Sequence, residues 1–297
     1  MLFNETYDVI VVGAGHAGCE AAAAAANLGS KTMLITMNMQ TIGQMSCNPA
    51  MGGIAKGQIV REIDAMGGFS GIVADKSAIQ FKMLNLSKGP AMWSPRTQND
   101  RMKFAEEWRY VLENTPNLDF FQDMVKSLII NNGKVEGVIT SLGIEIKGKS
   151  VVLTNGTFLN GLIHVGDKQL GGGRMGEPKA YGITEQLVDL GFEAGRMKTG
   201  TPVRVDGRSL DYSKMEEQFG DERVVPFSFS TDPEAVQIEQ KSCWLTYTNE
   251  KTHEIIRANL DRSPLYSGMI EGTGPRYCPS IEDKVVRKKK KKRHQVF

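Results

Sequence analysis

Two cysteines are the strongest candidates for covalent chemistry, because each lies in a segment rich in Pro and Gly. Cys47 lies within residues 44–53, and Cys278 lies within residues 272–284. A thiolate is a strong nucleophile, and the basic residues that accompany both cysteines in sequence would favour the thiolate form. We therefore predict that both thiols are catalytic.

A motif near the start of the chain is typical of a nucleotide-binding turn. It consists of Gly13, Ala14, Gly15, His16, Ala17 and Gly18. In this GxGxxG pattern the first glycine permits a tight turn, the second lets the backbone approach a pyrophosphate, and the third brings helix and strand close together. The alternative, a purely structural glycine turn, is less consistent with the position of the motif between a predicted strand and a predicted helix.

The elements around this turn predict a βαβ unit. Residues 7–12 and 31–36 are apolar runs of strand length, and residues 16–28 contain an alanine run that favours a helix. No Asp or Glu lies between Glu20 and Glu62, although dinucleotide folds usually place an acid there to bind the ribose. A plain NAD-dependent dehydrogenase is therefore less consistent with the sequence. Neutral side chains would bind the ribose, and the candidates are Asn38 and Gln44.

Composition and charge indicate a globular protein of the reducing cytoplasm. The 297 residues are 40% hydrophobic, and the four cysteines show neither disulfide nor zinc-ligand spacing, so we predict no metal site. Cys19 and Cys243 are predicted to be small buried residues. The amino end has no signal-peptide pattern and no apolar run long enough to span a membrane. Residues 287–293 are all basic, and we interpret them as a solvated terminus, with an RNA-binding arm as the alternative.

The middle of the chain predicts a β-meander that returns to the sheet. Short β runs occupy residues 125–130, 135–140, 144–146 and 151–154, with a hairpin turn at Asn132-Gly133. Such a meander is typical of two-dinucleotide flavoproteins. Further helices are predicted over residues 53–65, 99–112 and 182–190.

Several cations are candidates for substrate contacts. Lys88 lies in a Gly/Pro loop, Arg174 follows three glycines in a loop that we expect to be flexible and exposed, and Arg96 and Arg101 could contact phosphate. For Arg101 the alternative is a solvated helix face, with Trp108 of the same helix in the core.

Five motifs resemble the glucose-inhibited division protein A family, the flavoprotein subunit of the enzyme that modifies the wobble uridine of tRNA. They are residues 13–18, the Cys47 loop, residues 85–91, residues 198–202 and the Cys278 segment. The resemblance runs from about residue 5 to Arg287.

The resemblance implies a homodimeric FAD protein that adds a carboxymethylaminomethyl group to carbon 5 of uridine 34 in certain tRNAs, together with a GTPase partner. Methylenetetrahydrofolate would supply the methylene, and NADH would reduce the flavin. FAD would contact residues 13–18, Val125 and position 180, where Ala180 replaces a Ser of relatives and leaves only a backbone contact. The implied NAD region comprises Gly274, Pro275, Arg276, Tyr277, Cys278, Pro279, Ser280, Ile281, Glu282, Asp283 and Lys284.

Two thiols suit this chemistry. Carbon 5 of uracil becomes nucleophilic when a thiolate adds at carbon 6, and a second group must then remove the carbon-5 proton. The sequence does not decide which of Cys47 and Cys278 has which role. The uridine must leave the anticodon stack to reach either thiol.

The expected fold is an α/β protein with a Rossmann-like doubly wound sheet, a β-meander and an inserted mixed α/β domain. Residues 1–200 would be the first part of the FAD-binding domain, residues 201–270 the inserted substrate or NAD domain, and residues 271–297 a return segment with the Cys278 loop and the basic tail. Relatives continue beyond Arg287 with mixed charges and then a helical carboxyl-terminal domain. The alternative to an active enzyme is therefore a truncated, catalytically silent fragment that binds FAD and tRNA.

Overall fold

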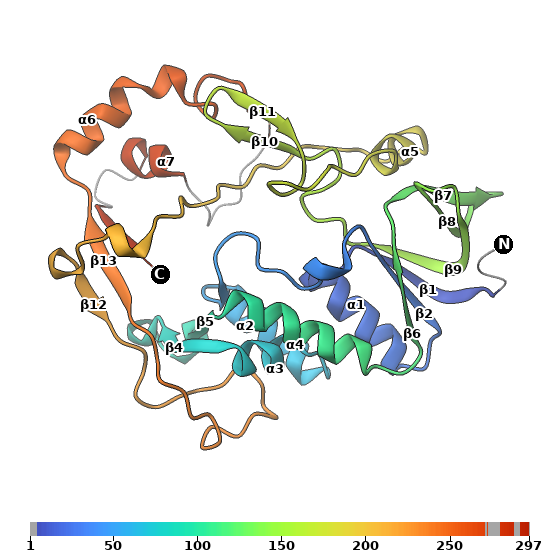
Figure 1. Cartoon of the computed structure of the whole chain (residues 1–297), viewed down its shortest axis with the longest axis horizontal. Coiled ribbons are helices and arrows are strands. Elements are labelled where there is room, and N and C mark those ends of the chain that lie inside the picture. The colour runs from blue at the N-terminus through green and yellow to red at the C-terminus, as the bar shows by residue number, and fades with distance from the viewer. Residues whose placement is uncertain (1–4, 271, 273–279, 288–291, 297) are drawn as a thin grey trace.

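The fold is built around a six-stranded sheet with the order β6-β2-β1-β9-β8-β7 (Figure 1). The computed structural model describes residues 5–270, 272, 280–287 and 292–296. Four neighbouring strands run parallel, and the last two are antiparallel. In sheet order the strands are β6 (Leu118–Gln122), β2 (Thr32–Thr36), β1 (Tyr7–Val12), β9 (Glu145–Leu153), β8 (Lys134–Thr140) and β7 (Val125–Asn131).

The β-meander is confirmed, with one correction. Asn132 and Gly133 both have positive φ, 51° and 75°, as the tight turn between β7 and β8 requires. The runs predicted at 144–146 and 151–154 form a single strand, β9. Its first residues pair with β8 and its later residues pair with β1, so the polar stretch between the two runs continues the strand instead of interrupting it.

Both faces of the sheet are covered, which explains why the central strand β1 is apolar at every position from Val9 to Val12. Val11 faces the cluster that includes helix α1 (His16–Asn27) and helix α4 (Arg101–Glu113), whereas Ile10 faces a second cluster against the meander. Trp108 of α4 is fully buried, so its predicted place in the core is confirmed. Helix α5 (Ile183–Asp189) contributes Ile183 to the second cluster.

The helix predicted to begin at Gly53 begins three residues later. Helix α2 (Lys56–Ala65) is preceded by Gly53 and Ala55 with φ of +89° and +67°, and these values are incompatible with a right-handed helix. A short helix that was not predicted, α3 (Ser70–Lys76), follows α2. The remaining helices are α6 (Glu250–Ala258) and α7 (Ile281–Val286).

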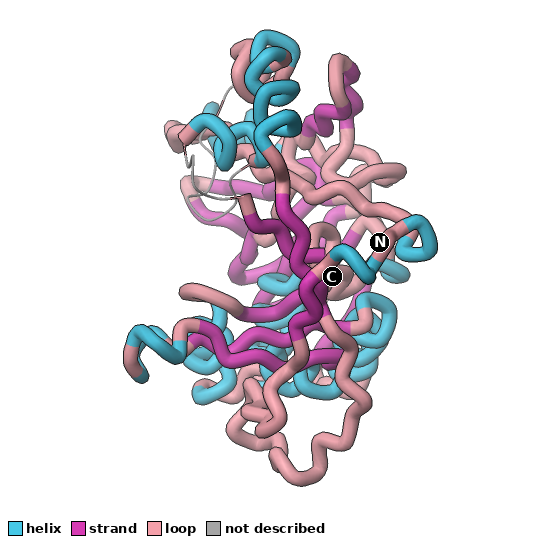
Figure 2. Tube along the Cα trace, turned by 90° about the vertical axis from the view of Figure 1, so that its left-hand side faces the viewer, coloured by secondary structure: helices cyan, strands magenta, loops and turns pink. Residues whose placement is uncertain are grey.

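The smaller sheets were not predicted. One has the order β3-β5-β4, with β3 (Ala50–Gly52), β5 (Ser94–Asn99) and β4 (Ala78–Leu84). Another consists of β12 (Glu216–Gln218), β13 (Cys243–Tyr247) and β14 (Arg293–Val296), and a hairpin joins β10 (Leu162–Val165) to β11 (Lys168–Gly171). Short 3-10 turns lie at Met39–Thr41, Leu86–Lys88, Pro90–Met92, Gly207–Ser209, Tyr212–Lys214 and Leu260–Arg262. Figure 1 shows α1–α4 beside the six-stranded sheet, with α6 and α7 on the opposite side of the molecule, and Figure 2 shows strands between these two groups of helices.

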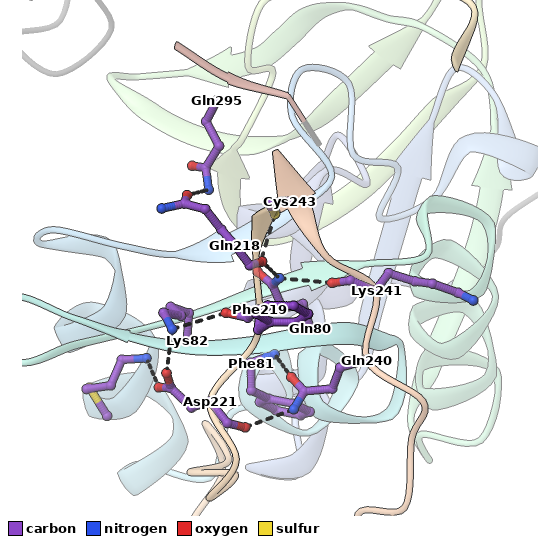
Figure 3. A network of polar contacts seen from close by, with 11 residues as sticks. Gln80, Phe81, Lys82, Gln218, Phe219, Asp221, Gln240, Lys241, Cys243 and Gln295 are labelled. Carbon is purple, nitrogen blue, oxygen red and sulfur yellow. Dashed lines mark hydrogen bonds and ion pairs between the residues drawn. The ribbon is translucent and has the colours of Figure 1, made fainter. Parts of the chain in front are cut away.

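A network of polar contacts joins β4 to the segment around β12 and β13 (Figure 3). The Gln80 side chain donates to the carbonyl oxygens of Gln218 and Lys241 at 3.1 and 2.9 Å, and it accepts from the thiol of Cys243. The Asp221 carboxylate accepts from the backbone N–H of Met83 at 2.6 Å. This network fixes part of the segment 201–270 to the β3-β5-β4 sheet, while the division of the chain into three domains remains a prediction.

Candidate functional site

The glycine-rich turn has the geometry that its sequence predicts. Gly13 has φ of +100°, and a Cβ added there would lie 2.7 Å from the carbonyl oxygen of Thr154. A Cβ on Gly18 would lie 1.7 Å from the carbonyl oxygen of Gly13, so only glycine allows α1 to approach the turn. A Cβ on Gly15 would meet no atom within 4 Å. The turn is therefore tightly packed on its inner side and open at its middle glycine.

The end of β9 supports the turn from the neighbouring strand. The Thr154 hydroxyl donates to the carbonyl oxygens of Val12 and Gly13 at 2.8 and 2.9 Å, and its backbone N–H also donates to Val12. Helix α1 begins at His16 without a side-chain cap and has no acidic residue in its first turn. The first N–H groups of α1 are thus available to an anion, and the residues present fit the pyrophosphate of a dinucleotide.

His16 is a structural part of this turn. Its Nε2 lies 3.1 Å from the carbonyl oxygen of Gly43, and its ring packs on Phe104 at 5.2 Å between centroids. Because a carbonyl oxygen only accepts, Nε2 carries the proton. Burial lowers the pKa of His16, so the neutral ring is favoured. Gly43 also donates to the Ala14 carbonyl oxygen, and its Cα faces Trp108, so the core holds the turn in place.

The neutral candidates for ribose binding already have partners. The Asn38 side chain accepts from the backbone N–H of Gln40 at 2.9 Å, and the Gln44 side-chain oxygen accepts from Arg174. Glu20 is the last acidic residue before the stretch that contains no Asp or Glu, and its side chain accepts from the backbone N–H groups of Phe69 and Ser70. Glu20 therefore fixes the start of α3. The assignment of Asn38 and Gln44 to ribose binding stays a prediction.

Cys47 lies exposed in the loop that precedes β3. Its thiol contacts the carbonyl oxygen of Gly200 at 3.8 Å, while Met45 on the same loop is buried. Arg204 donates from Nη2 to the backbone carbonyl oxygens of Cys47 at 2.7 Å and Ser46 at 3.3 Å. Sequence reasoning missed Arg204. The only available signal was its position two residues beyond the recognised motif at 198–202.

The loop around Arg174 is exposed at Gly171, Met175 and Gly176, as expected, and its flexibility stays a prediction, but the Arg174 side chain is largely covered. The Arg174 side chain is 19% exposed, because its guanidinium forms an ion pair with Glu177 at 3.1 Å, donates to Gln44 and lies over the ring of Phe158. Burial lowers the pKa of Arg174, and the like charge of Arg101 acts in the same direction. Arg174 therefore lies beside Gln44 of the Cys47 loop, and Arg101, from a distant part of the sequence, is close enough to act on its charge.

The other predicted cations lie in different environments. Arg96 on β5 is half-buried, burial lowers its pKa, and its Nη1 donates to the Gln295 side chain at 3.1 Å. Lys88 is exposed at the end of a 3-10 turn. Arg101 opens α4, and its Nε is a buried atom without a hydrogen-bond partner in the described residues, as is Nε of Arg174.

Val125 and Ala180, the implied FAD contacts outside the turn, are both buried. The N–H of Ala180 donates to the Phe158 carbonyl oxygen at 2.9 Å, and its own carbonyl oxygen accepts from Asn160 at 2.7 Å. A backbone contact at Ala180 therefore has only the second lone pair of its carbonyl oxygen to use.

The predicted residues 274–279, including Cys278, lie outside the residues that the structure describes. The remaining residues of the predicted NAD region, 280–284, begin helix α7. Ser280 caps this helix with Asp283, Glu282 accepts from the hydroxyl of Ser263 at 2.9 Å, and Asp283 accepts from that of Tyr266 at 3.1 Å. These three side chains therefore stabilise the local fold. The meeting of the two catalytic thiols stays a prediction.

Among the described residues, no group of three or more His, Cys, Asp or Glu side chains could hold a metal ion. The described helices are also too short or too polar to cross a membrane.

The parallel sheet, the glycine turn before α1 and the meander that returns to β1 define the dinucleotide-binding class of α/β proteins. The profile of the family described as glucose inhibited division protein A matches residues 8–297, and the chain belongs to this family. The match continues beyond Arg287, where the resemblance was expected to end.

Relatives and solved structures agree with this family. The chain is 71% identical over 296 residues to the tRNA uridine 5-carboxymethylaminomethyl modification enzyme MnmG of Flavobacterium johnsoniae and 70% identical to that of Christiangramia forsetii. Each match covers 100% of this chain and 47% of the relative. Aquifex aeolicus GidA in its form I crystal is 53% identical with a TM-score of 0.91, covering 98% of this chain and 49% of that chain. The chain thus spans about half the length of these relatives.

Proposed function

We propose that this chain is the amino-terminal half of an FAD-dependent enzyme that adds a carboxymethylaminomethyl group to carbon 5 of the wobble uridine of certain tRNAs. The relatives named as tRNA uridine modification enzymes support the reaction class. The observation that carries the proposal on this chain is the open glycine turn beside the loop that presents Cys47.

FAD is the cofactor that the turn would hold. Gly13 and Gly18 let α1 approach β1, and Gly15 leaves the space in which a pyrophosphate could contact the backbone. Bound FAD would supply the redox chemistry for a methylene group from methylenetetrahydrofolate, with NADH as the reductant. Val125, Ala180 and residues 274–284 are proposed as further FAD and NAD contacts.

The thiols would act on the uracil ring. One of Cys47 and Cys278 would add through its sulfur to carbon 6, which makes carbon 5 nucleophilic, and the other would help to remove the carbon-5 proton before the sulfur leaves. The exposure of Cys47 allows a flipped uridine to reach its sulfur. The sulfur is released at the end of this sequence, so the thiol is regenerated.

The cations near the Cys47 loop are proposed contacts for the anionic substrate. The Nε atoms of Arg101 and Arg174 are buried donors without hydrogen-bond partners in the described chain. A buried unpaired donor is costly, so an acceptor such as a phosphate oxygen would be stabilised there. Lys88 and Arg96 are proposed as further contacts to tRNA. We also propose a cytoplasmic location, a homodimer and a GTPase partner for the whole protein.

The first test is the flavin spectrum of the purified chain. We expect the chain to bind FAD, to show the yellow flavin absorbance and to melt at a higher temperature with added FAD, because a ligand that binds only the native state stabilises it by mass action. A colourless chain that also rejects added FAD would contradict the cofactor assignment.

The second test concerns turnover. A full-length relative whose amino-terminal half is replaced by this chain should modify tRNA, and Cys47→Ser should abolish modification without loss of tRNA binding. The buried thiol of Cys19 offers a control, because Cys19→Ala changes no proposed reacting group. Normal turnover by the Cys47→Ser protein would exclude the proposed role of this thiol.

A further inference from the structure

The Cys47 loop is held by a segment that lies more than 150 residues downstream. Arg204 reaches two consecutive carbonyl oxygens, those of Ser46 and Cys47, and the carbonyl oxygen of Gly200 faces the thiol. One short stretch of chain therefore contacts both the backbone and the sulfur of Cys47. The loop is also anchored on its amino-terminal side, where Gln44 accepts from Arg174.

These contacts are of different kinds and fix different degrees of freedom. A guanidinium that donates to two successive carbonyl oxygens restrains the peptide plane between Ser46 and Cys47. The contact of the thiol with Gly200 favours one orientation of the Cys47 side chain. Restraint of the plane and of the side chain together sets the direction in which an otherwise exposed sulfur points.

The charge of Arg204 adds a second effect. Its Nη2 lies 2.7 Å from the carbonyl oxygen of the same residue that carries the thiol. Arginine stays protonated at every pH at which a cysteine titrates. A permanent positive charge is thus placed beside Cys47, whereas Arg208, four residues later, forms an ion pair with Asp206 at 2.7 Å and its side chain is 91% exposed.

We infer that Arg204 is a positioning residue for Cys47, which directs the reacting sulfur of Cys47 toward the substrate and supplies positive potential beside it. This inference rests on the proposed function in its use of Cys47 as a reacting thiol. Its physical content, the orientation and the electrostatic surroundings of that thiol, can be measured without turnover.

The first measurement compares two alkylating reagents at Cys47, with the labelled peptide quantified by mass spectrometry. Iodoacetate is anionic and iodoacetamide is neutral. The rate constant for iodoacetate divided by that for iodoacetamide therefore reports the electrostatic potential at the Cys47 sulfur. Two unit charges several ångströms apart in water interact by less than about 1 kcal/mol, so removal of the positive charge in Arg204→Gln should lower this ratio by roughly two- to fourfold. Arg204→Lys should retain most of the ratio, and Arg208→Gln should not change it. An unchanged ratio in Arg204→Gln would overturn the inference.

The second measurement is turnover by the full-length relative that carries this chain. Misplacement of a reacting group by about 1 Å costs up to roughly a hundredfold in rate, so we expect Arg204→Gln to lower kcat at least about tenfold with tRNA affinity unchanged. Arg204→Lys should recover part of the loss. If Cys47→Ser abolishes turnover but Arg204→Gln does not alter kcat, the inference fails and the proposed function stands. If Cys47→Ser is fully active, the proposed role of Cys47 as a reacting thiol fails, and the alkylation ratio still decides the placement of Arg204.

Discussion

Gly15 and Gly18 lie three residues apart in the same turn, yet the structure predicts opposite consequences for replacing them with Ala. At Gly18 the new Cβ would lie 1.7 Å from the Gly13 carbonyl oxygen and 2.7 Å from the Thr154 hydroxyl. At Gly15 it would meet no atom within 4 Å, and the backbone there is extended with φ of −76°. One substitution should therefore damage the fold, and the other should damage only the binding of a ligand.

The magnitudes follow from these distances. In Gly18→Ala, α1 and the turn must separate by about 1 Å, and such overpacking costs about 1–3 kcal/mol or more, against which the helix preference of Ala offsets about 1 kcal/mol. A contact of 1.7 Å lies at the severe end of such overpacking, so we expect a net loss of about 2 kcal/mol or more in the free energy of unfolding. In Gly15→Ala the change should stay under about 1 kcal/mol, because Ala only replaces Gly at the N-cap.

The assay pairs urea unfolding without ligand with FAD titration of the folded chain. Gly15→Ala should lower FAD affinity at least about tenfold, which corresponds to about 1.4 kcal/mol, because its methyl group would occupy the space assigned to the pyrophosphate. The stability of this variant should remain close to that of the unmodified chain. Wild-type FAD affinity in Gly15→Ala would refute the placement of the pyrophosphate, and an undiminished stability of Gly18→Ala would refute the packing argument.

Three further predictions concern stability. Trp108→Ala should lower the free energy of unfolding by about 3–5 kcal/mol, measured in urea, because a fully buried ring is replaced by a cavity beneath the glycine turn; a loss under about 1 kcal/mol would contradict this. Because the pKa of His16 is lowered in the folded protein, the unfolded chain binds more protons than the folded protein below about pH 6.5. The free energy of unfolding should therefore fall as the pH drops from 7.5 to 5.5, and it should fall less steeply in His16→Gln. Equal slopes in the two proteins would exclude this role of the ring. Gln80→Leu should cost about 1–3 kcal/mol, because the carbonyl oxygens of Gln218 and Lys241 lose their donor; Gln237→Leu, which is not part of this network, provides the control.

Local patterns predicted the parts of the fold in which local preferences and tertiary structure agree. The alanine run of α1 and the Asn132-Gly133 turn each carry their own conformational preference, and both are found where expected. Strand β5 was missed for a physical reason. It reads as a polar loop, yet Thr97 and Asn99 are buried, and Asn99 donates to the Ala74 carbonyl oxygen at 2.7 Å. Satisfied hydrogen bonds, which no local pattern reveals, allow this strand to lie inside the protein.

The candidate site likewise has one part that local sequence patterns predicted and another that they did not. The glycine turn was predictable, because the spacing of its three glycines between a strand and a helix is a local pattern, although Gly13 packs on the distant Thr154. The surroundings of Cys47 were not, because Arg174 and Arg204 reach its loop across 130 or more positions of the chain. A loop rich in Gly beside Arg174 suggested mobility, but an ion pair and an aromatic ring hold the guanidinium. Contacts between residues so far apart in sequence depend on the complete tertiary fold, which local patterns do not reveal.

Strand β9 links the β-meander to the glycine turn. The strand is continuous from its pairing with β8 to Leu153, and the next residue, Thr154, is the one whose hydroxyl supports the glycine turn. In an extended strand, successive side chains alternate between faces, so a slip of one position turns every side chain over. The length of the hairpin at Asn132 and Gly133 therefore helps to set the register of β9 and the direction of the Thr154 side chain. An insertion of one residue there that shifted β9 would rotate the threonine away from the glycine turn, and we expect it to weaken FAD binding at the proposed site.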